Sequence, residues 1–191
     1  MSLYLTRHGQ TDWNKNQLIQ GRIDVPLNEV GLAEAKQLAL TLKGVRLDKI
    51  ISSPLERALN TAKAVNEYHH LEIEIDNRLL EQFYGDLEGT PRSGPIYLHH
   101  RQSIAARYPN GEGYFDVVHR IYSLLDEIKA KYRDKNVLLV GHGGISRVIR
   151  SYFQGFENED FVTFGIPNCG LLKFEFVDRD FPTIVPQAKT E

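Results

Sequence analysis

The chain has 191 residues, of which 41% are hydrophobic and 25% are charged, and its formal net charge at pH 7 is −2. This length fits one domain of ordinary size, and the composition excludes wholesale disorder. The near balance of 23 basic and 25 acidic residues excludes a polycationic nucleic-acid binder and gives no support for a protein that binds anionic membranes.

The sequence predicts a cytoplasmic protein. A single cysteine, Cys169, excludes an intrachain disulfide and favours a reducing compartment. The N-terminal segment lacks the basic and apolar regions of a signal peptide. No apolar run approaches the ~20 residues that cross a bilayer. We therefore expect neither a membrane nor a nucleic acid as partner.

Short apolar segments alternate with helical periodicity along the chain. Strands are predicted at 3–6, 50–51, 73–75 and 137–140, and the last of these is an unbroken apolar run of the kind found in strands covered on both faces. Four apolar stripes at helical spacing lie between or after them: Leu32, Ala35, Leu38 and Leu42; Leu55, Ala58, Ala62 and Val65; Phe115, Val118, Tyr122, Leu125 and Ile128; and Ile145, Val148, Ile149, Tyr152 and Phe153.

This alternation predicts an α/β three-layer sandwich, with a mainly parallel central sheet and helices on both faces. A last strand at 171–177 follows a turn at 166–170, so we expect it to be antiparallel at an edge. Residues 1–180 are predicted to form a single domain, and 181–191 a loose C-terminal tail. Asn28 is the expected N-cap of the first long helix. The run Ser53-Pro54-Leu55-Glu56 predicts a capping box with proline at the first helical position.

The segment at about 86–113 interrupts the alternation and has the character of a lid-like insertion. From residue 89 to residue 111 it contains no acidic residue, while five basic or imidazole side chains occur there: Arg92, His99, His100, Arg101 and Arg107. Two interpretations stand side by side. The segment is an ordinary surface loop with a short helix, or it is a cationic cover over an anionic substrate, because such insertions gather where the strands of an open sheet end.

Histidines follow two of the predicted strands. Arg7-His8-Gly9 comes directly after the first strand, and Gly141-His142-Gly143-Gly144 follows the strongest strand and opens a helix. Strand ends of an open parallel sheet line its ligand crevice, guanidinium groups match phosphate geometry, and helix N-termini attract anions. Each motif alone is weak evidence, since an arginine beside a partly buried histidine is common and a glycine-rich turn is more often just a tight connection.

An arginine and a group of acidic residues are further candidates for the site. Arg57 is the fourth residue after Ser53, in the first turn of the predicted helix, where a positive charge opposes the helix dipole unless an anion is near. Glu81, Asp86 and Glu88 are the acids of the segment at 79–89, and spacing alone selects none of them. The remaining histidines lack a second ligand at zinc-like spacing, so no metal site is expected.

Together these segments resemble the histidine phosphatase superfamily, also called the phosphoglycerate mutase-like family. The resemblance runs from residue 3 to about residue 176. It rests on four ordered blocks: Leu5-Thr6-Arg7-His8-Gly9-Gln10-Thr11 with Trp13-Asn14 and Gln20-Gly21; Ser52-Ser53-Pro54-Leu55-Glu56-Arg57-Ala58 with Thr61-Ala62; Leu80-Glu81 with Tyr84-Gly85 and Glu88-Gly89; and Gly141-His142-Gly143-Gly144.

The resemblance implies a phosphohistidine enzyme with His8 as the nucleophile and Glu81 as the proton donor to the leaving oxygen. A neutral imidazole must attack, so its other nitrogen needs an acceptor, for which we expect a backbone carbonyl. The residues implied to hold the phosphoryl group are Arg7, Asn14, Gln20, Gly21, Arg57, His142 and the Gly143 amide. Tyr84 falls where relatives often touch substrate, or it serves packing. Two arginines and a histidine neutralise the transferred group without a metal, and no cofactor is expected.

Three functions remain in view. Glu81 and His142 lie 61 positions apart, whereas the glycolytic mutases have an insertion there that is longer by a few tens of residues, so a phosphatase is favoured. Arg92 falls near a lysine of the mutases, and Arg101 and Arg107 are candidates for binding a second anionic group, which keeps a mutase as the alternative. A catalytically inactive binding relative is disfavoured because the implied catalytic residues are all present.

The sequence leaves the substrate open within one class, small phosphorylated metabolites, and it leaves the oligomeric state open. One segment departs from the phosphatase pattern. Relatives commonly have Gly-Glu-Ser before the third helix, but this chain has Gly111-Glu112-Gly113. The missing serine puts in doubt any contact or helix cap that it makes in relatives.

Overall fold

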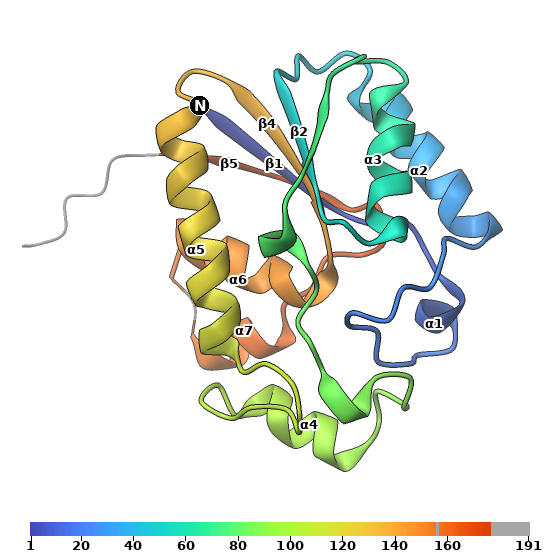
Figure 1. Ribbon diagram of the computed structural model, residues 1–191, viewed down its shortest axis with the longest axis vertical. Coiled ribbons are helices and arrows are strands. Elements are labelled where there is room, and N and C mark those ends of the chain that lie inside the picture. Colours follow the sequence, from blue (N-terminus) through green and yellow to red (C-terminus); the bar gives the residue numbers. More distant parts are fainter. Residues whose placement is uncertain (156, 177–191) are drawn as a thin grey trace, which may run out of the picture.

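A five-stranded sheet forms the centre of the molecule (Figure 1). The computed structural model describes residues 1–155 and 157–176, so the expected tail at 181–191 lies outside the described residues. The strand order is β3-β2-β4-β1-β5, with β5 antiparallel to β1 and the other neighbours parallel. The strands are β1 (Ser2–Arg7), β2 (Lys49–Ser52), β3 (Ile73–Ile75), β4 (Asn136–Gly141) and β5 (Leu171–Glu175). The predicted antiparallel edge strand is confirmed, although Val177, its expected end, is not among the described residues.

Helices cover both faces of the sheet, which confirms the three-layer α/β architecture (Figure 1). On one face, α2 (Glu29–Leu42) and α3 (Glu56–Asn66) bury Leu38, Leu42 and Ala62 against the strands. On the other face, α5 (Tyr114–Lys131) and α6 (Gly143–Phe153) form the larger core. β4 contributes side chains to both cores, which explains its unbroken apolar sequence.

Two of the predicted apolar stripes each contain a residue that is exposed to solvent. Phe115 of α5 is 65% exposed, and the buried face begins instead with Tyr114 and Val117. Leu32 of α2 is 48% exposed. Both residues lie at the border of a helical stripe, where a rotation of one position moves a side chain from the core to solvent.

The predicted capping box at Ser53 is wrong. α3 begins at Glu56, and its N-cap, Leu55, makes no side-chain cap hydrogen bond. The Ser53 hydroxyl lies 2.7 Å from Nε2 of His142 instead, and the Glu56 amide donates to Asp24 at 2.7 Å. A tertiary contact therefore replaces the local cap. The Asn28 cap of α2 is confirmed, since its side chain accepts from the Gly31 amide at 2.9 Å.

The expected insertion consists of η2 (Gly85–Leu87), α4 (Pro95–Gln102) and the loops around them. α4 lies away from the sheet, on the same side of the molecule as α1 (Asp12–Lys15) and α7 (Asn158–Thr163) (Figure 1). The loop between η2 and α4 is bonded to the N-terminal part of the chain, because the Ile19 amide donates to the Thr90 carbonyl at 2.8 Å. Within residues 1–155 and 157–176, no helix combines the length and apolar character needed to span a membrane.

Candidate active site

The two strand-end histidines meet at one edge of the sheet. β1 and β4 are parallel neighbours in which Arg7 pairs with Gly141, so the next residue of each strand leaves at the same point. The His8 amide donates to the Gly141 carbonyl at 3.0 Å, and the ring centroids of His8 and His142 lie 5.2 Å apart. Strand register therefore brings together two histidines that are far apart in sequence.

His8 is held as a neutral imidazole with one free ring nitrogen. Its Nδ1 donates to the Gly9 carbonyl at 2.7 Å, the kind of acceptor that the sequence predicted, and Nε2 keeps its lone pair. Burial, followed by the positive charges of Arg57 and Arg7, holds the pKa of His8 well below its usual value. Because Nε2 is unprotonated, it is able to act as a nucleophile.

His142 lies beside His8, with one ring nitrogen bonded and the other without a partner. Ser53 Oγ accepts from the Leu55 amide at 3.4 Å and lies 2.7 Å from Nε2 of His142, a pair in which either atom is able to donate. When the Ser53 hydroxyl donates to Nε2, the proton of the neutral ring resides on Nδ1, which has no partner among the described residues. Burial is also the main cause of a pKa of His142 well below the usual value.

Arg57 is fully buried, and its positive charge lowers the pKa of both histidines. Its terminal nitrogens donate to the carbonyls of Gly21 at 2.6 Å and Ile23 at 3.0 Å, with Asp24 Oδ1 at 3.4 Å. Burial lowers the pKa of Arg57 to about 10, so the group remains charged at neutral pH. Gly21 therefore orients Arg57 through its carbonyl. A Cβ at position 21 would lie 2.7 Å from the backbone carbonyl oxygen of Gln82, so only glycine fits there.

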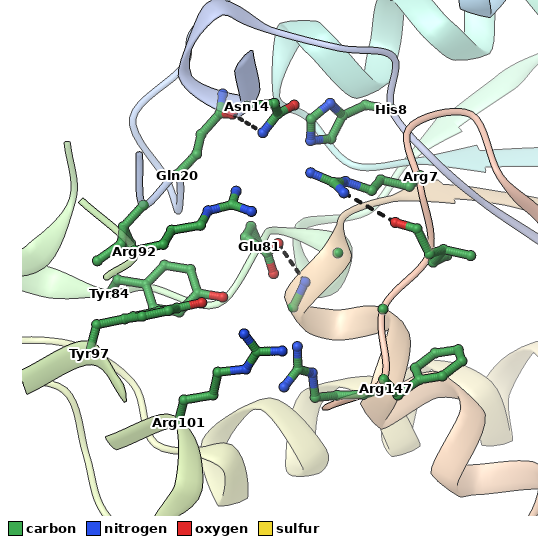
Figure 2. Close-up of a pocket in the computed structure, with 16 residues that line it drawn as sticks. Arg7, His8, Asn14, Gln20, Glu81, Tyr84, Arg92, Tyr97, Arg101 and Arg147 are labelled. Carbon is green, nitrogen blue, oxygen red and sulfur yellow. Dashed lines mark hydrogen bonds between the residues drawn. The ribbon is translucent and has the colours of Figure 1, made fainter. Parts of the chain in front are cut away.

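Several polar groups share one cavity with His8 (Figure 2). Asn14 donates to Oε1 of Gln20 at 3.1 Å, and Thr11 donates to the same oxygen at 2.8 Å. Arg7 donates through Nη1 to the Ile166 carbonyl at 3.1 Å, and burial and Arg92 lower its pKa. The lining also includes Ile19, Glu81, Tyr84, Arg92, Tyr97, Arg101, Gly143, Gly144, Arg147, Phe164 and Gly165.

Buried donors without partners gather in and beside this cavity. Of the six unpartnered buried side-chain atoms in the described part of the chain, five belong to this region: Nε of Arg7, Arg57 and Arg147, Nε2 of Gln20 and Nδ1 of His142; the sixth is Nε2 of His69. A buried donor left unsatisfied costs about 1–3 kcal/mol. Such a concentration of unpaired donors is explained by a ligand with several acceptor oxygens, and a phosphoryl group has that character.

Glu81 lies at the N-terminus of α6, with both oxygens engaged. Its Oε2 accepts from the Gly144 amide at 2.8 Å, and Oε1 accepts from the amides of Gln82 at 2.8 Å and Ile145 at 3.1 Å. The carboxyl group also lines the cavity (Figure 2). A Cβ on residue 144 would lie 2.5 Å from the Glu81 carboxyl group, so glycine is required for this close approach.

Arg120 of α5 braces the segment that carries Glu81. Its guanidinium donates to the carbonyls of Arg78, Leu80 and Glu81, the last two at 2.7 and 3.3 Å. Glu112 pairs with Arg120 at 3.1 Å and accepts from the Phe83 amide at 3.0 Å. The departure at Gly111-Glu112-Gly113 thus keeps the glutamate that organises this loop. Sequence analysis missed Arg120, because nothing in a mid-helix arginine signals contacts about 40 positions away.

Of the other predicted residues, some line the cavity and one does not. Tyr84 lines the cavity and also packs edge-on against Tyr108 at 5.0 Å, so it is placed for both roles considered. Arg92 and Arg101 line the cavity, whereas Arg107 does not, since it is 67% exposed and pairs with Asp116. The expectation that Arg107 binds a second anion is not supported. Sequence reasoning also missed Arg147 and Tyr97, because neither belongs to a motif block and only α6 and α4 bring them to the cavity.

Known proteins resemble this chain over most of its length. The uncharacterized phosphatase PhoE of Bacillus subtilis is 34% identical over 175 residues, covering 92% of this chain and 88% of the relative. The probable phosphoglycerate mutase GpmB of Yersinia pestis is 31% identical, with coverage of 92% and 85%. A solved structure of mycobacterial glucosyl-3-phosphoglycerate phosphatase with VO3 superimposes with a TM-score of 0.82 at 29% identity, covering 90% of this chain and 91% of that one.

A family model matches nearly the whole chain. The sequence model of the histidine phosphatase superfamily (branch 1) matches residues 3–186, a range that contains the helices, every residue of the cavity and, apart from Ser2, the sheet. Four motif blocks that are separate in sequence converge on His8. By sequence, fold and the residues gathered at the ends of its strands, the chain belongs to branch 1 of the histidine phosphatase superfamily.

Proposed function

We propose that the protein hydrolyses phosphomonoesters of small anionic metabolites through a phosphohistidine on His8. The main support for this proposal is a set of buried hydrogen-bond donors that have no partner. These donors surround the neutral imidazole of His8, whose Nε2 is free. In the proposed complex, the phosphoryl oxygens accept from Arg7, Arg57, Gln20 and His142. These groups act in a site shielded from water, where fixed donors stabilise charge on the transferred group more strongly than solvent does.

The proposed reaction has two steps. Nε2 of His8 attacks phosphorus as the bond to the ester oxygen breaks, and Glu81 donates a proton to that oxygen, so an alcohol leaves. Water then attacks the phosphohistidine, Glu81 accepts a proton from the water, and inorganic phosphate is released with His8 regenerated. Glu81 thus alternates between acid and base, which agrees with its position in the cavity beside Gly143 and Gly144.

The named relatives support both hydrolysis and its alternative. Phosphatases are among the relatives, and so is a probable phosphoglycerate mutase. The short interval between Glu81 and His142 favours hydrolysis. An inactive binding role is disfavoured because Arg7, Arg57 and Glu81 accompany both histidines. We also propose a cytoplasmic location, a single domain at 1–180 with a lid at about 86–113, and turnover without metal or cofactor.

The test is phosphate release in EDTA from p-nitrophenyl phosphate and a panel of metabolite monoesters. Wild-type protein is expected to release inorganic phosphate, and His8→Ala is expected to lose at least about a thousandfold in kcat. His119→Ala, at an exposed histidine, is the control and should keep full activity. Absolute dependence on a divalent metal would contradict the proposal that side chains of the protein alone neutralise the transferred phosphoryl group. Transfer of phosphate to an added phosphoglycerate without net release would favour the mutase.

A further inference from the structure

The turn that precedes β5 is bonded to the strand end that carries His8. The Cys169 amide donates to the Arg7 carbonyl at 3.0 Å, and the Asn168 side chain donates through Nδ2 to the His8 carbonyl at 2.9 Å. The Ile166 carbonyl accepts from the Arg7 guanidinium at 3.1 Å. Three residues of one turn therefore contact the nucleophilic histidine and the arginine before it.

Asn168 also contacts a side chain of the cavity. Its Nδ2 donates to Oδ1 of Asn14 at 3.1 Å, and the Thr11 amide donates to the same oxygen at 3.2 Å. These two donors fix the orientation of the Asn14 amide group, because its oxygen faces both of them and its nitrogen is directed elsewhere. Asn14 is buried and lines the cavity together with His8 (Figure 2).

The same arrangement continues from Asn14 to Gln20. Oε1 of Gln20 accepts from Nδ2 of Asn14 at 3.1 Å and from the Thr11 hydroxyl at 2.8 Å, so Nε2 of Gln20 is left as a buried donor without a partner. Nδ2 of Asn14 uses one of its two protons for Gln20, and within residues 1–155 and 157–176 the other proton has no acceptor. Both amide groups thus have their oxygens occupied and a nitrogen available to an anion.

We propose that Asn168 is a positioning residue for the phosphoryl group and that it acts through Asn14. The inference rests on the proposed function, which places the phosphoryl group at His8. Phosphoryl oxygens accept hydrogen bonds, so an amide nitrogen binds them and an amide oxygen repels them. Without Asn168, one donor instead of two holds the oxygen of Asn14, and that oxygen is able to turn toward the cavity.

A structural role for Asn168 makes a different prediction. If its side chain only holds the backbone at His8, its removal would weaken phosphate binding equally whether or not residue 14 is an asparagine. If Asn168 acts through Asn14, its removal has little effect once the Asn14 side chain is gone. A double-mutant cycle separates the two roles, because residues that act through each other are not additive.

The cycle is measured as the Kd of inorganic phosphate, by calorimetry in EDTA. We expect Asn14→Ala to raise the Kd by about 10- to 100-fold, as loss of a hydrogen bond to a charged group does. Asn168→Ala should raise it at least about fivefold in the wild-type background and less than about twofold in the Asn14→Ala background. Asn168→Asp keeps the size of the side chain but has no proton to donate. Its effect should be at least about fivefold larger in the wild-type background than in Asn14→Ala.

Asn28→Ala is the matched control, since it removes an asparagine side chain that caps α2 outside the cavity. It should lower the melting temperature and leave the phosphate Kd within about twofold. An effect of Asn168→Ala that is equal in both backgrounds, or absent from both, would overturn the positioning role while leaving hydrolysis intact. A wild-type protein that neither binds phosphate nor hydrolyses esters would contradict the proposed function and this role together.

Discussion

Two glutamates of one segment have opposite surroundings. Glu81 lines the cavity beside Gly143 and Gly144, and its carboxyl group receives three backbone amides. The Glu88 carboxyl group accepts from the amides of Arg22 and Ile23, both at 2.8 Å, and from that of Tyr84 at 3.3 Å. Glu88 therefore holds two loops together, and Glu81 is the one of the two that lines the cavity.

Glu81→Gln should slow the hydrolysis of alkyl phosphates more than that of p-nitrophenyl phosphate. An alkoxide leaves poorly without a proton, whereas a nitrophenolate leaves unaided, and a placed proton donor accelerates such steps by about 10²–10⁴. Single-turnover kinetics of the phosphorylation step measure this contrast, because dephosphorylation also becomes slow in the variant. Glu88→Gln is the control and should leave the dependence on the leaving group unchanged. A leaving-group effect that appears in Glu88→Gln and not in Glu81→Gln would reverse the assignment.

At this scale, sequence patterns identify the residues that the chain itself places at strand ends. His8 and His142 follow strands, and their meeting needs only adjacent parallel strands. Arg147 and Arg120 could not be found in the same way. Their roles depend on where a carbonyl or a charge of a distant segment lies, and no local pattern encodes such a contact.

Besides packing against the sheet, α5 holds the segment around Glu81 in place through hydrogen bonds. Arg120 donates to three carbonyls of the segment around Glu81 and pairs with Glu112, which in turn accepts from Arg22 at 2.8 Å. The helix, the insertion boundary and the acid-bearing loop thus share one hydrogen-bond network. The position of Glu81 depends on a helix that contributes no side chain to the cavity.

Replacing Arg120 should destabilise the protein and displace Glu81. We expect Arg120→Gln to lower the free energy of unfolding by about 2–4 kcal/mol, because carbonyls and a carboxylate lose a largely buried charged partner. Urea denaturation measures this change. Arg107→Gln breaks an exposed ion pair with Asp116 and should cost less than about 1 kcal/mol. Equal effects of the two substitutions would show that the Arg120 network is not important for stability.

The elements were largely predictable, and the exceptions have physical causes. The short apolar segments and the helical periodicities predict the five strands and the four main helices because burial in the core generates those patterns. The start of α3 was mispredicted because Ser53 bonds to His142 instead of capping the helix. Phe115 belongs to a predicted apolar stripe but is exposed, because periodicity alone does not separate a buried stripe from its border.

The whole molecule carries buried histidines that affect its stability against acid. The pKa values of His8 and His142 lie well below the usual value, mainly because of burial, and burial lowers that of His69 as well. In the unfolded chain a histidine takes up a proton near pH 6.5, whereas in the native state burial moves protonation of these rings to a lower pH. The unfolded state therefore binds more protons below that pH, and stability falls as the pH decreases.

Between pH 7.5 and pH 5.5, His8 and His142 should each reduce the free energy of unfolding by about 1.4 kcal/mol. Carboxylates with lowered pKa values, such as Asp48 and Glu175, lose their stabilisation only near pH 4 and below, outside this window. Urea titrations in phosphate-free buffer measure the difference. His8→Gln should reduce the loss by about 1.4 kcal/mol, and His119→Gln, at an exposed histidine, should not change it. An unchanged pH dependence in His8→Gln would mean that His8 is protonated in the native protein.

In the proposed reaction, a phosphoryl group is bonded covalently to His8 during turnover. Rapid quenching with radiolabelled substrate, followed by peptide mapping, tests it most directly. Wild-type protein should show label that is stable to base and labile to acid, located on the peptide that contains His8. His8→Ala should show none, and Glu81→Gln should accumulate it. Label on another residue, or full turnover by His8→Ala, would contradict the account.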